Sequence, residues 1–300
     1  MNSIHELIKK YNNISLNTKL SNYSWFNLGG PAEYLFKPNN KSQLISFLKD
    51  NKKNNLKITV LGAGSNTLIR DNGIRGVVIK LGSGFKEIKL VEKDIIEVGA
   101  AVLDRKISNY AKEKGLGNLE FLSCIPGSIG GAVIMNSGCY GNDISKVLES
   151  INVIDIENCI ERKLKNNEIK FFYRGTNLPN KYIITSVMLK GKNLPKSQIE
   201  KIENEMIQRK KLSQPSQVKT CGSTFKNLIG KKKAWEIIKE TGCNDFKEGD
   251  AVISKKHCNF FVNNGKANSA DIEKLINKVR KAVKDKSGVN LELEIKIIGE

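Results

Sequence analysis

Hydrophobic residues in the first two thirds of the chain occur in short runs that predict strands. Residues 58–61 and 76–79 are two such runs, and the glycine-rich turn and Asp71-Asn72-Gly73 turn between them leave no room for a long helix. Residues 94–100, 150–156 and 182–189 predict further strands. Residues 102–114 instead carry apolar side chains at helical spacing, and Gly115 and Gly117 end that predicted helix.

The last third of the chain mixes helices and strands. Residues 196–211 predict a charged helix that enters a loop marked by Pro215, and residues 233–241 predict a second helix. A third helix begins at Asn268 or Ser269, ends at Gly288 and is apolar on one face. Residues 259–262 and 291–298 predict strands. We therefore expect an α+β protein whose two domains meet near residues 191–216.

The composition is that of a globular protein of about two domains, with 300 residues of which 39% are apolar. A net charge of +19 favours anionic partners. The lysines are scattered and not interleaved with aromatic residues, which favours a solvated surface over a nucleic-acid-binding face. Six cysteines without a C-x-x-C pair and only two histidines indicate neither a zinc site nor a disulfide framework.

The sequence contains no sign of export or of membrane insertion. The first ten residues lack an apolar core followed by a small-residue cleavage site. The longest mostly apolar stretch, residues 121–135, is too short to span a bilayer and is broken by Pro126 and several glycines. We expect a cytoplasmic protein without stable membrane insertion.

Two glycine-dense turns interrupt the strand-like sequence and are candidate phosphate cradles, because consecutive backbone N–H groups in such turns converge on anions. A dinucleotide-binding Rossmann unit is disfavoured, since Thr67 stands at its third-glycine position and no helix follows. The alternative is that these glycines serve only tight turns. The candidate residues are Leu61, Gly62, Ala63, Gly64, Ser65 and Asn66 in the first loop, and Pro126, Gly127, Ser128, Gly130 and Gly131 in the second.

Reactive side chains gather in residues 220–227, where Gly222 precedes Ser223. No histidine and aspartate relay accompanies Ser223, so this serine is either a turn hydroxyl or a proton donor to a carbanion whose charge is stabilised nearby. Arg174 follows three aromatic residues and is either aimed at an anion or part of a structural ion pair. Glu294, flanked by apolar residues on a strand, is either solvated or functional.

A series of motifs in order along the chain resembles the UDP-N-acetylenolpyruvoylglucosamine reductase (MurB) family of bacterial peptidoglycan synthesis. The similarity runs from about Trp25 to the C-terminus, and the set of motifs is specific although each alone is weak. The motifs lie at residues 25–32, 61–66, 125–132 with 135–138, 173–174, 222–227, 257–260 and 294–295.

The resemblance implies an FAD-binding domain of the vanillyl-alcohol-oxidase (PCMH) type over residues 1–195, with a core at about 26–191. A smaller α/β substrate-binding domain would follow over residues 196–300. The two glycine loops, extended to Ala132, would hold the FAD diphosphate. The resemblance implies no metal.

The resemblance also implies a reaction. NADPH would reduce the flavin, and flavin N5 would then pass hydride to C3 of the enolpyruvyl ether of a UDP-sugar, giving UDP-N-acetylmuramate. Ser223 would protonate C2 while Arg174 and Glu294 polarise the carboxylate. Tyr173, Lys226 and Asn227 would bind the substrate, with Lys226 and Asn227 at the nucleotide diphosphate.

The sequence departs from the family pattern at several positions, and two other functions stay open. Leu228 stands where proline is common, Thr176 replaces a serine, and residues 247–250 differ from the usual glycine pair. The short segment between Arg174 and Arg209 resembles the shorter family type, without a tyrosine-bearing closing loop. The alternatives are a basic nucleic-acid-binding protein and another flavin oxidoreductase of the same fold; the oligomeric state, including a monomer, stays open.

Overall fold

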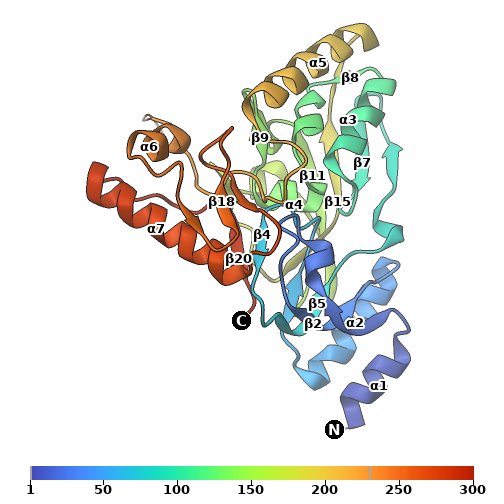
Figure 1. Cartoon of the computed structure of the whole chain (residues 1–300). Coiled ribbons are helices and arrows are strands. Elements are labelled where there is room, and N and C mark those ends of the chain that lie inside the picture. The colour runs from blue at the N-terminus through green and yellow to red at the C-terminus, as the bar shows by residue number, and fades with distance from the viewer. Residues whose placement is uncertain (1, 229, 231) are drawn as a thin grey trace. The chain divides into compact units, whose positions relative to one another are not determined.

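A computed structural model describes residues 2–228, 230 and 232–300 (Figure 1). The chain forms two compact units that are interleaved along the sequence. The first unit comprises residues 1–15, 34–63 and 76–209, and the second comprises residues 16–33, 64–75 and 210–300. The compact units differ from the predicted division into residues 1–195 and 196–300, because each unit combines several separate segments of the chain. The linear division stays a prediction.

The first unit is built around a five-stranded antiparallel sheet of order β12-β11-β15-β7-β6. Its register aligns Ile151 with Val187 and Val187 with Val98, so three fully buried β-branched side chains form one row across the sheet. This row belongs to the main core of the unit. The strands are β6 (Ile88–Leu90), β7 (Ile95–Gly99), β11 (Leu148–Asp155), β12 (Ile160–Lys165) and β15 (Tyr182–Lys190).

The helices of the first unit include α3 (Asp104–Glu113), which the spacing of apolar residues predicted. Glu203 of α5 (Lys196–Ser213) is buried, and it accepts hydrogen bonds from Ser108 at 2.9 Å and Lys112 at 2.8 Å. These two hydrogen bonds attach α5 to α3. They explain why the charged helix belongs mostly to the first unit. The other helices are α1 (Asn2–Lys10), α2 (Lys41–Asn54) and the short α4 (Ile129–Ile134).

A second sheet has the order β1-β2-β5-β3, and β3 and β5 pair in parallel with Ile58 opposite Val77. The connection between these two parallel strands contains β4 (Thr67–Ile69) and no helix. The absence of a Rossmann crossover, predicted from the glycine loop and the turn at Asp71, is confirmed for this segment. The strands are β1 (Ile14–Lys19), β2 (Pro31–Phe36), β3 (Ile58–Val60) and β5 (Ile74–Ile79), and the unit boundaries fall within or just after them.

The described residues also form short two-stranded ribbons and 3₁₀ turns. The ribbons pair β8 (Leu116–Gly117) with β16 (Lys192–Asn193), β9 (Gly138–Cys139) with β10 (Asn142–Asp143), and β13 (Phe171–Phe172) with β14 (Gly175–Thr176). The 3₁₀ turns are η1 (Leu20–Tyr23), η2 (Ser83–Phe85), η3 (Glu120–Cys124), η4 (Ile144–Lys146) and η5 (Asn166–Glu168).

The second unit contains a three-stranded antiparallel sheet, a parallel pair of strands and two helices. The sheet consists of β17 (Lys247–Glu248), β18 (Ala251–Ile253) and β19 (Phe261–Asn263), and the helices are α6 (Ala234–Glu240) and α7 (Ser269–Ser287). The C-terminal strand β20 (Lys296–Ile298) pairs in parallel with β4. It is shorter than the predicted strand over 291–298, because regular pairing begins only at Lys296.

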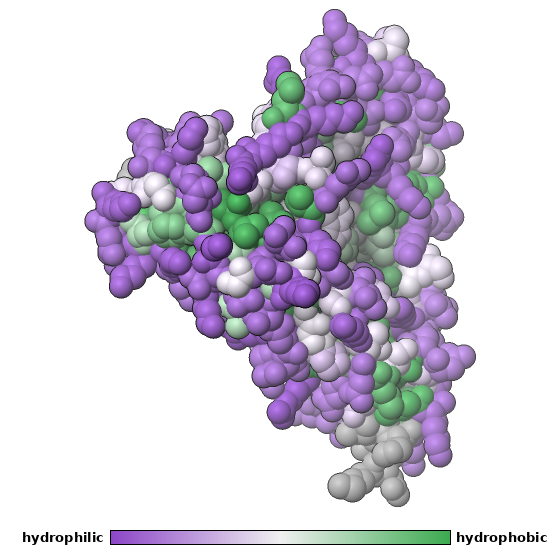
Figure 2. All heavy atoms as spheres, in the orientation of Figure 1, coloured by the Kyte–Doolittle hydropathy of each residue, from purple (hydrophilic) through white to green (hydrophobic). Residues whose placement is uncertain are grey.

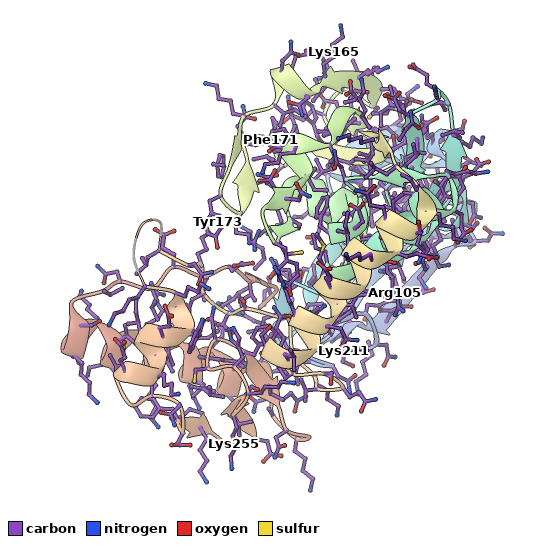
Figure 3. The ribbon with its side chains drawn as sticks, turned by 90° about the horizontal axis from the view of Figure 1, so that it is seen from above. Arg105, Lys165, Phe171, Tyr173, Lys211 and Lys255 are labelled. Atoms are coloured by element: carbon purple, nitrogen blue, oxygen red, sulfur yellow. The ribbon has the colours of Figure 1, made fainter. Side chains whose placement is uncertain are left out.

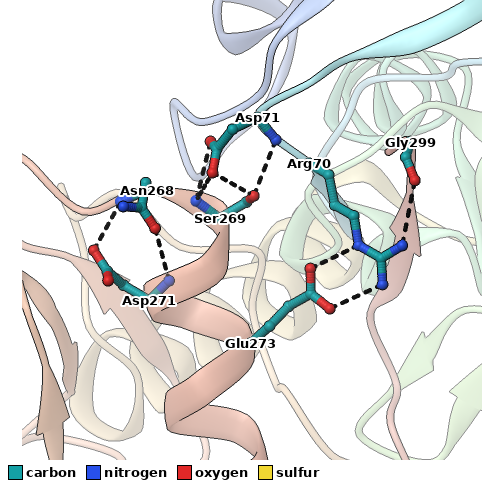
Figure 4. Close-up of polar contacts among 7 residues, drawn as sticks. All are labelled: Arg70, Asp71, Asn268, Ser269, Asp271, Glu273 and Gly299. Carbon is teal, nitrogen blue, oxygen red and sulfur yellow. Dashed lines mark hydrogen bonds and ion pairs between the residues drawn. The ribbon is translucent and has the colours of Figure 1, made fainter.

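Helix α7 begins and ends as the sequence predicted. Asn268 accepts from the amide of Asp271 at 2.8 Å, and the Asp271 carboxylate accepts from the amide of Asn268 at 3.1 Å (Figure 4). Gly288 follows the helix with φ 70°, a left-handed conformation that glycine adopts without strain. The side chains of Glu273 and Arg70 pair at 2.8 Å and 3.0 Å, which joins the helix to the segment that follows β4.

Hydrophilic side chains cover most of the face of the molecule shown in Figure 2, in keeping with the predicted lysine-rich solvated surface. Within the described residues, every helix is too short or too polar to traverse a lipid bilayer.

Candidate active site

Ser223 lies in a segment of the second unit that is held from two sides. Residue 223 pairs with Phe260 as an isolated antiparallel bridge. The amide of Thr224 donates to the carbonyl of Asn259 at 2.7 Å, and the amide of Glu294 donates to the carbonyl of Thr224 at 2.9 Å. Ser223 and Glu294, far apart in the sequence, are therefore brought onto neighbouring backbone segments, and both are half-buried.

Asn259 is a positioning residue that the sequence analysis did not identify. Its side chain is 2% exposed, accepts from the amide of Phe225 at 2.9 Å and donates to the carbonyl of Phe225 at 2.8 Å. An amide side chain that satisfies both main-chain groups of one residue acts as a strand partner would. The asparagine of the 257–260 motif was the available signal, but its partner is distant in sequence.

His257 does not have the arrangement of a general base for Ser223. Its Nδ1 accepts from the amide of Asn259 at 3.3 Å, and burial, followed by the nearby positive charge of Lys233, lowers its pKa. A neutral imidazole engaged with the main chain stabilises this turn. This geometry agrees with the sequence, in which no histidine and aspartate relay accompanies Ser223.

Gly222 and Cys221 shape the backbone before the serine. Gly222 has φ +80°, and no atom lies within 4 Å of the position that a Cβ would occupy, so glycine is required for conformation and the space beside it is open. Cys221 is buried, and burial raises its pKa to about 12. Its thiol lies 3.3 Å from the Thr67 carbonyl oxygen, so Cys221 is a packed thiol rather than a nucleophile.

The end of the first glycine loop lies beside Glu294. The side-chain amide of Asn66 donates to the carbonyl of Glu294 at 3.0 Å, and the amide of Lys296 donates to the carbonyl of Asn66 at 2.9 Å. Gly64 has φ +69°, and a Cβ there would stand 1.9 Å from the carbonyl oxygen of Tyr23, so only glycine fits. Residues 64–66 thus belong to the second unit, whereas residues 61–63 belong to the first.

Within the first unit, the two glycine loops are neighbours. A Cβ built at Gly62 would stand 3.0 Å from the Oγ of Ser128, and Gly62 and Gly131 are both exposed. Exposed glycine backbone on two adjacent segments, next to a hydroxyl, fits a diphosphate, because such an anion is bound by main-chain N–H groups that it can approach closely.

Part of the second loop is committed to its own fold. The amide of Ile129 donates to the carbonyl of Val102 and the amide of Gly130 to the carbonyl of Ala100, both at 3.0 Å. A Cβ at Gly130 would also stand 3.1 Å from the Cβ of Ala100. The absence of a side chain at Gly130 therefore serves close packing.

Arg174 occupies an unusual backbone conformation. It is the second residue of the turn between β13 and β14, with φ 59°, which is left-handed and costs a non-glycine residue of order 1 kcal/mol or more. Its guanidinium lies 5.1 Å from the ring centre of Tyr173, a cation–π distance. Phe171 and Tyr173 come from the same hairpin (Figure 3).

This hairpin is attached to α4, which contains Gly130, Gly131 and Ala132, so the end of the predicted second glycine turn is helical. Asn136 donates to the carbonyl of Phe172 at 3.3 Å, and Thr176 donates to the carbonyl of Ile134 at 3.3 Å. Phe172 is 53% exposed and Tyr173 is 37% exposed. The first unit therefore places an arginine and two accessible aromatic rings on a segment fixed to α4.

Lys226 and Asn227 have structural partners as well as accessible donors. The Nζ of Lys226 lies 3.5 Å from a carboxylate oxygen of Glu292, and this lysine is half-buried. The side-chain oxygen of Asn227 accepts from the amide of Ala234 at 3.1 Å, which caps α6. The side-chain NH₂ of Asn227 can still bind a ligand.

The structure thus gathers the predicted residues in two groups. Ser223, Glu294, Lys226, Asn227 and residues 64–66 belong to the second unit, and Arg174, Tyr173, residues 61–63 and residues 126–132 belong to the first. All six cysteines are free thiols, and the described residues contain no group of three potential metal ligands.

Comparison with known proteins matches two parts of the chain to two family models. Residues 32–158 match the FAD binding domain, and residues 214–298 match the UDP-N-acetylenolpyruvoylglucosamine reductase C-terminal domain. The chain is 43% identical over 98% of its length to the UDP-N-acetylenolpyruvoylglucosamine reductase of Pelagibacter ubique, covering 99% of that protein. It is 41% identical over 94% of its length to that of Wolbachia pipientis, covering 95% of that protein.

A solved structure shows the same fold. The crystal structure of UDP-N-acetylenolpyruvylglucosamine reductase from Thermus caldophilus is similar with a TM-score of 0.82 at 32% identity, covering 95% of this chain and 98% of that chain. The α+β fold class, with an FAD-binding domain ahead of a C-terminal domain, is confirmed.

An FAD-binding domain joined to a reductase C-terminal domain defines a flavoprotein oxidoreductase. The identity over nearly the whole length then assigns the family: the chain belongs to the UDP-N-acetylenolpyruvoylglucosamine reductases. The family predicted from the sequence motifs is confirmed.

Proposed function

We propose that this enzyme reduces UDP-N-acetylenolpyruvoylglucosamine to UDP-N-acetylmuramate with NADPH as the electron donor and FAD as the bound carrier. The reaction adds hydride to C3 and a proton to C2 of the enolpyruvyl double bond, so both atoms and charge balance. When bound, FAD supplies the two-electron chemistry, accepting hydride from NADPH and delivering it to C3. The observation that carries this proposal is the position of Ser223 on a backbone segment that is hydrogen-bonded to the segment of Glu294.

Ser223 donates the proton to C2 in this proposal. A hydroxyl is a weak acid, so its value as a donor depends on a fixed position and on stabilisation of the charge that develops on the substrate. The Asn259 side chain fixes Phe225, two residues after the serine, through two hydrogen bonds. The main chain of Thr224 is held between Asn259 and Glu294.

Arg174 and Glu294 polarise the enolpyruvyl carboxylate in this proposal. The left-handed backbone at Arg174 supports a functional role, since such strain persists where the surrounding structure holds a residue for a purpose. Glu294 is held by its own amide and, through its carbonyl, by Asn66. Its segment is therefore connected to the first glycine loop.

Tyr173, Lys226 and Asn227 bind the UDP-sugar in this proposal. The lysine ammonium and the asparagine amide supply hydrogen-bond donors for the diphosphate. Leu61 to Asn66, together with Pro126, Gly127, Ser128, Gly130, Gly131 and Ala132, line the FAD site; for Gly130 the contribution is the lack of a side chain. A net charge of +19 favours encounter with these anionic ligands.

We further propose a cytoplasmic location and no nucleic-acid partner, because the substrate is a soluble nucleotide sugar.

The test follows the flavin spectrum of the purified protein. We expect a yellow protein whose flavin absorbance is bleached by NADPH under anaerobic conditions and recovers on addition of UDP-N-acetylenolpyruvoylglucosamine. If the flavin absorbance does not recover with the UDP-sugar, or recovers only with an unrelated enol ether, the proposed substrate is wrong. A colourless protein that cannot be reconstituted with FAD would contradict the proposal as a whole.

A further inference from the structure

Lys80 lies against the first glycine loop although it is not part of it. It follows β5, and its amide donates to the carbonyl of Phe36 at 2.9 Å. Its ammonium donates to the carbonyl of Gly62 at 2.5 Å. The side chain is half-buried, so this lysine is not a freely solvated surface residue.

The contact with the Gly62 carbonyl fixes the direction of the next amide. A trans peptide is planar and its C=O and N–H point in opposite directions, so holding the Gly62 carbonyl toward Lys80 turns the Ala63 N–H away from Lys80. Glycine rotates easily about its backbone bonds, and without an anchor this peptide could turn over. Lys80 therefore selects one of two orientations of a loop that, in the proposed function, presents N–H groups to FAD.

We propose that Lys80 is a positioning residue of the FAD site, which holds the Gly62–Ala63 peptide in its binding orientation and places a positive charge behind the loop that binds the diphosphate. This inference rests on the proposed assignment of residues 61–63 to the FAD site. Main-chain N–H groups carry no formal charge. The ammonium group therefore adds a positive charge that attracts the diphosphate.

The electrostatic surroundings of Lys80 give this role a measurable consequence. Burial lowers the pKa of Lys80 to about 8, and the positive charges of Lys37, after β2, and Lys86, after η2, add to the effect. The loop residues Leu61, Gly62 and Ala63 have no titratable side chains. A dianionic diphosphate bound on the other side of this peptide would still attract the ammonium and raise its pKa, so FAD binding near pH 8 would be accompanied by proton uptake.

The direction of the pH effect follows from which form binds FAD. Below pH 8 Lys80 is charged and FAD binds tightly, and above pH 8 the unbound protein must first take up a proton. We expect the dissociation constant for FAD to rise above pH 8, by up to about tenfold per pH unit, and the uptake at pH 8 to approach about half a proton per FAD.

The experiment titrates FAD into full-length apoprotein prepared from the holoenzyme. Flavin fluorescence gives the affinity between pH 7 and 9.5, and calorimetry at pH 8 in two buffers of different ionisation enthalpy gives the proton uptake. Lys80→Met should weaken FAD binding about tenfold or more at pH 7 and abolish the uptake. Lys80→Arg should keep the affinity at pH 7 but remove both the pH dependence and the uptake, because the guanidinium does not titrate in this range.

Two further lysines serve as controls. Lys163→Met removes the same charge from the exposed strand β12 and should leave affinity and proton uptake unchanged. Lys86→Met removes a charge that lowers the pKa of Lys80, so the loss of affinity should move to higher pH.

The outcomes separate this inference from the proposed function. If the wild-type protein binds FAD with the same affinity from pH 7 to 9.5 and without proton uptake, or if Lys80→Met binds it as the wild type does, the role of Lys80 is wrong and the FAD site stands. If neither the wild type nor Lys163→Met binds FAD, the proposed function itself is wrong. If Lys80→Met does not fold, the pH dependence of FAD binding by the wild type and by Lys80→Arg still tests the role of Lys80.

Discussion

Backbone conformation and side-chain charge make separate contributions at Arg174. The left-handed φ of 59° suits glycine, whereas the proposed polarisation of the substrate carboxylate needs the guanidinium. A residue that is poor for the turn and good for the reaction is expected where function and stability compete. Substitutions that remove the charge with or without relieving the backbone strain distinguish these two contributions.

We expect Arg174→Gly to preserve or raise the stability of the fold, by about 1 kcal/mol, because it relieves the left-handed strain. The same variant should reduce the flavin with NADPH at the wild-type rate but oxidise it slowly with the UDP-sugar. Thermal unfolding and the two half-reactions measured by stopped flow test this. Arg174→Ala is the matched variant, since it removes the charge and keeps the strain. A glycine variant that reduces substrate normally would exclude the proposed role.

Ser223 allows a second test at the scale of a residue. Ser223→Ala should slow substrate reduction by roughly 10²-fold or more, the usual cost of losing a positioned proton donor, and should leave reduction of the flavin by NADPH unchanged. Ser216→Ala, at an exposed position, is the control for the substitution itself. Equal losses in the two half-reactions would instead indicate a structural hydroxyl.

At the scale of elements, the sequence predicted four helices and the strands that correspond to β3, β5, β7, β11, β15, β19 and β20, whereas β1, β2, β12 and the shorter strands were not predicted. Helix α7 has its predicted cap, apolar face and terminal glycine, and α3, α5 and α6 lie within a few residues of their predicted ranges. Helices α1, α2 and α4 were not predicted. The six residues of α4 are too few to show a helical period, whereas the buried Leu44, Phe47 and Leu48 of α2 do have helical spacing. The last strand was predicted too long, since alternation reports which side chains are buried and not how far a partner extends.

Helix α3 contains a buried carboxyl group whose energetics the sequence does not reveal. Asp104, at its first position, is fully buried, and neither carboxyl oxygen has a hydrogen-bond partner within the described part of the chain. Burial raises its pKa well above the usual value. The folded protein therefore disfavours the charged carboxylate at this position. The amide of Asp104 donates to the carbonyl of Gly127 in the second glycine loop.

The raised pKa of Asp104 predicts a change of stability with pH. Because its folded pKa lies above the unfolded value of about 3.9, its contribution is fully present below that value and is lost as pH rises toward the folded pKa. We expect Asp104→Asn to remove this loss and to be the more stable protein at pH 8, by on the order of 1.4 kcal/mol per unit of pKa shift. Urea unfolding of the wild type and Asp104→Asn at pH 5 and pH 8 measures the difference in their free energies of unfolding. A difference in stability between the two proteins that is the same at both pH values would contradict it.

At the scale of the whole molecule, the two units are interleaved along the chain. The core of the second unit combines Phe26, Leu28 and Leu68 with apolar residues from the C-terminal third, and strand β20 pairs with β4. The sequence suggested a linear boundary because charged helix 196–211 and Pro215 look like a linker. Such local signals cannot show that two earlier segments complete the later core.

This interleaving predicts that residues 196–300 alone do not form a stable domain. The fragment lacks three buried apolar side chains and the parallel partner of its last strand, and burying each such side chain contributes roughly 1.5–3 kcal/mol. We expect no cooperative unfolding transition and poorly dispersed amide resonances, with the full-length chain as the control. A fragment with a sharp transition and dispersed spectrum would support the linear domain boundary.

The sequence by itself determined the family, the identity of the candidate chemical groups and those helices and strands whose hydrophobic periodicity is pronounced. Hydrophobic periodicity and turn chemistry are local, and the motifs retain their order and spacing along the chain, so both can be recognised without coordinates. The contacts of Asn259 and Lys80 were decided only by the tertiary structure, because each side chain bonds to a backbone group brought beside it by folding. The burial of Asp104 was decided in the same way, since the free energy of a charge depends on what surrounds it in space.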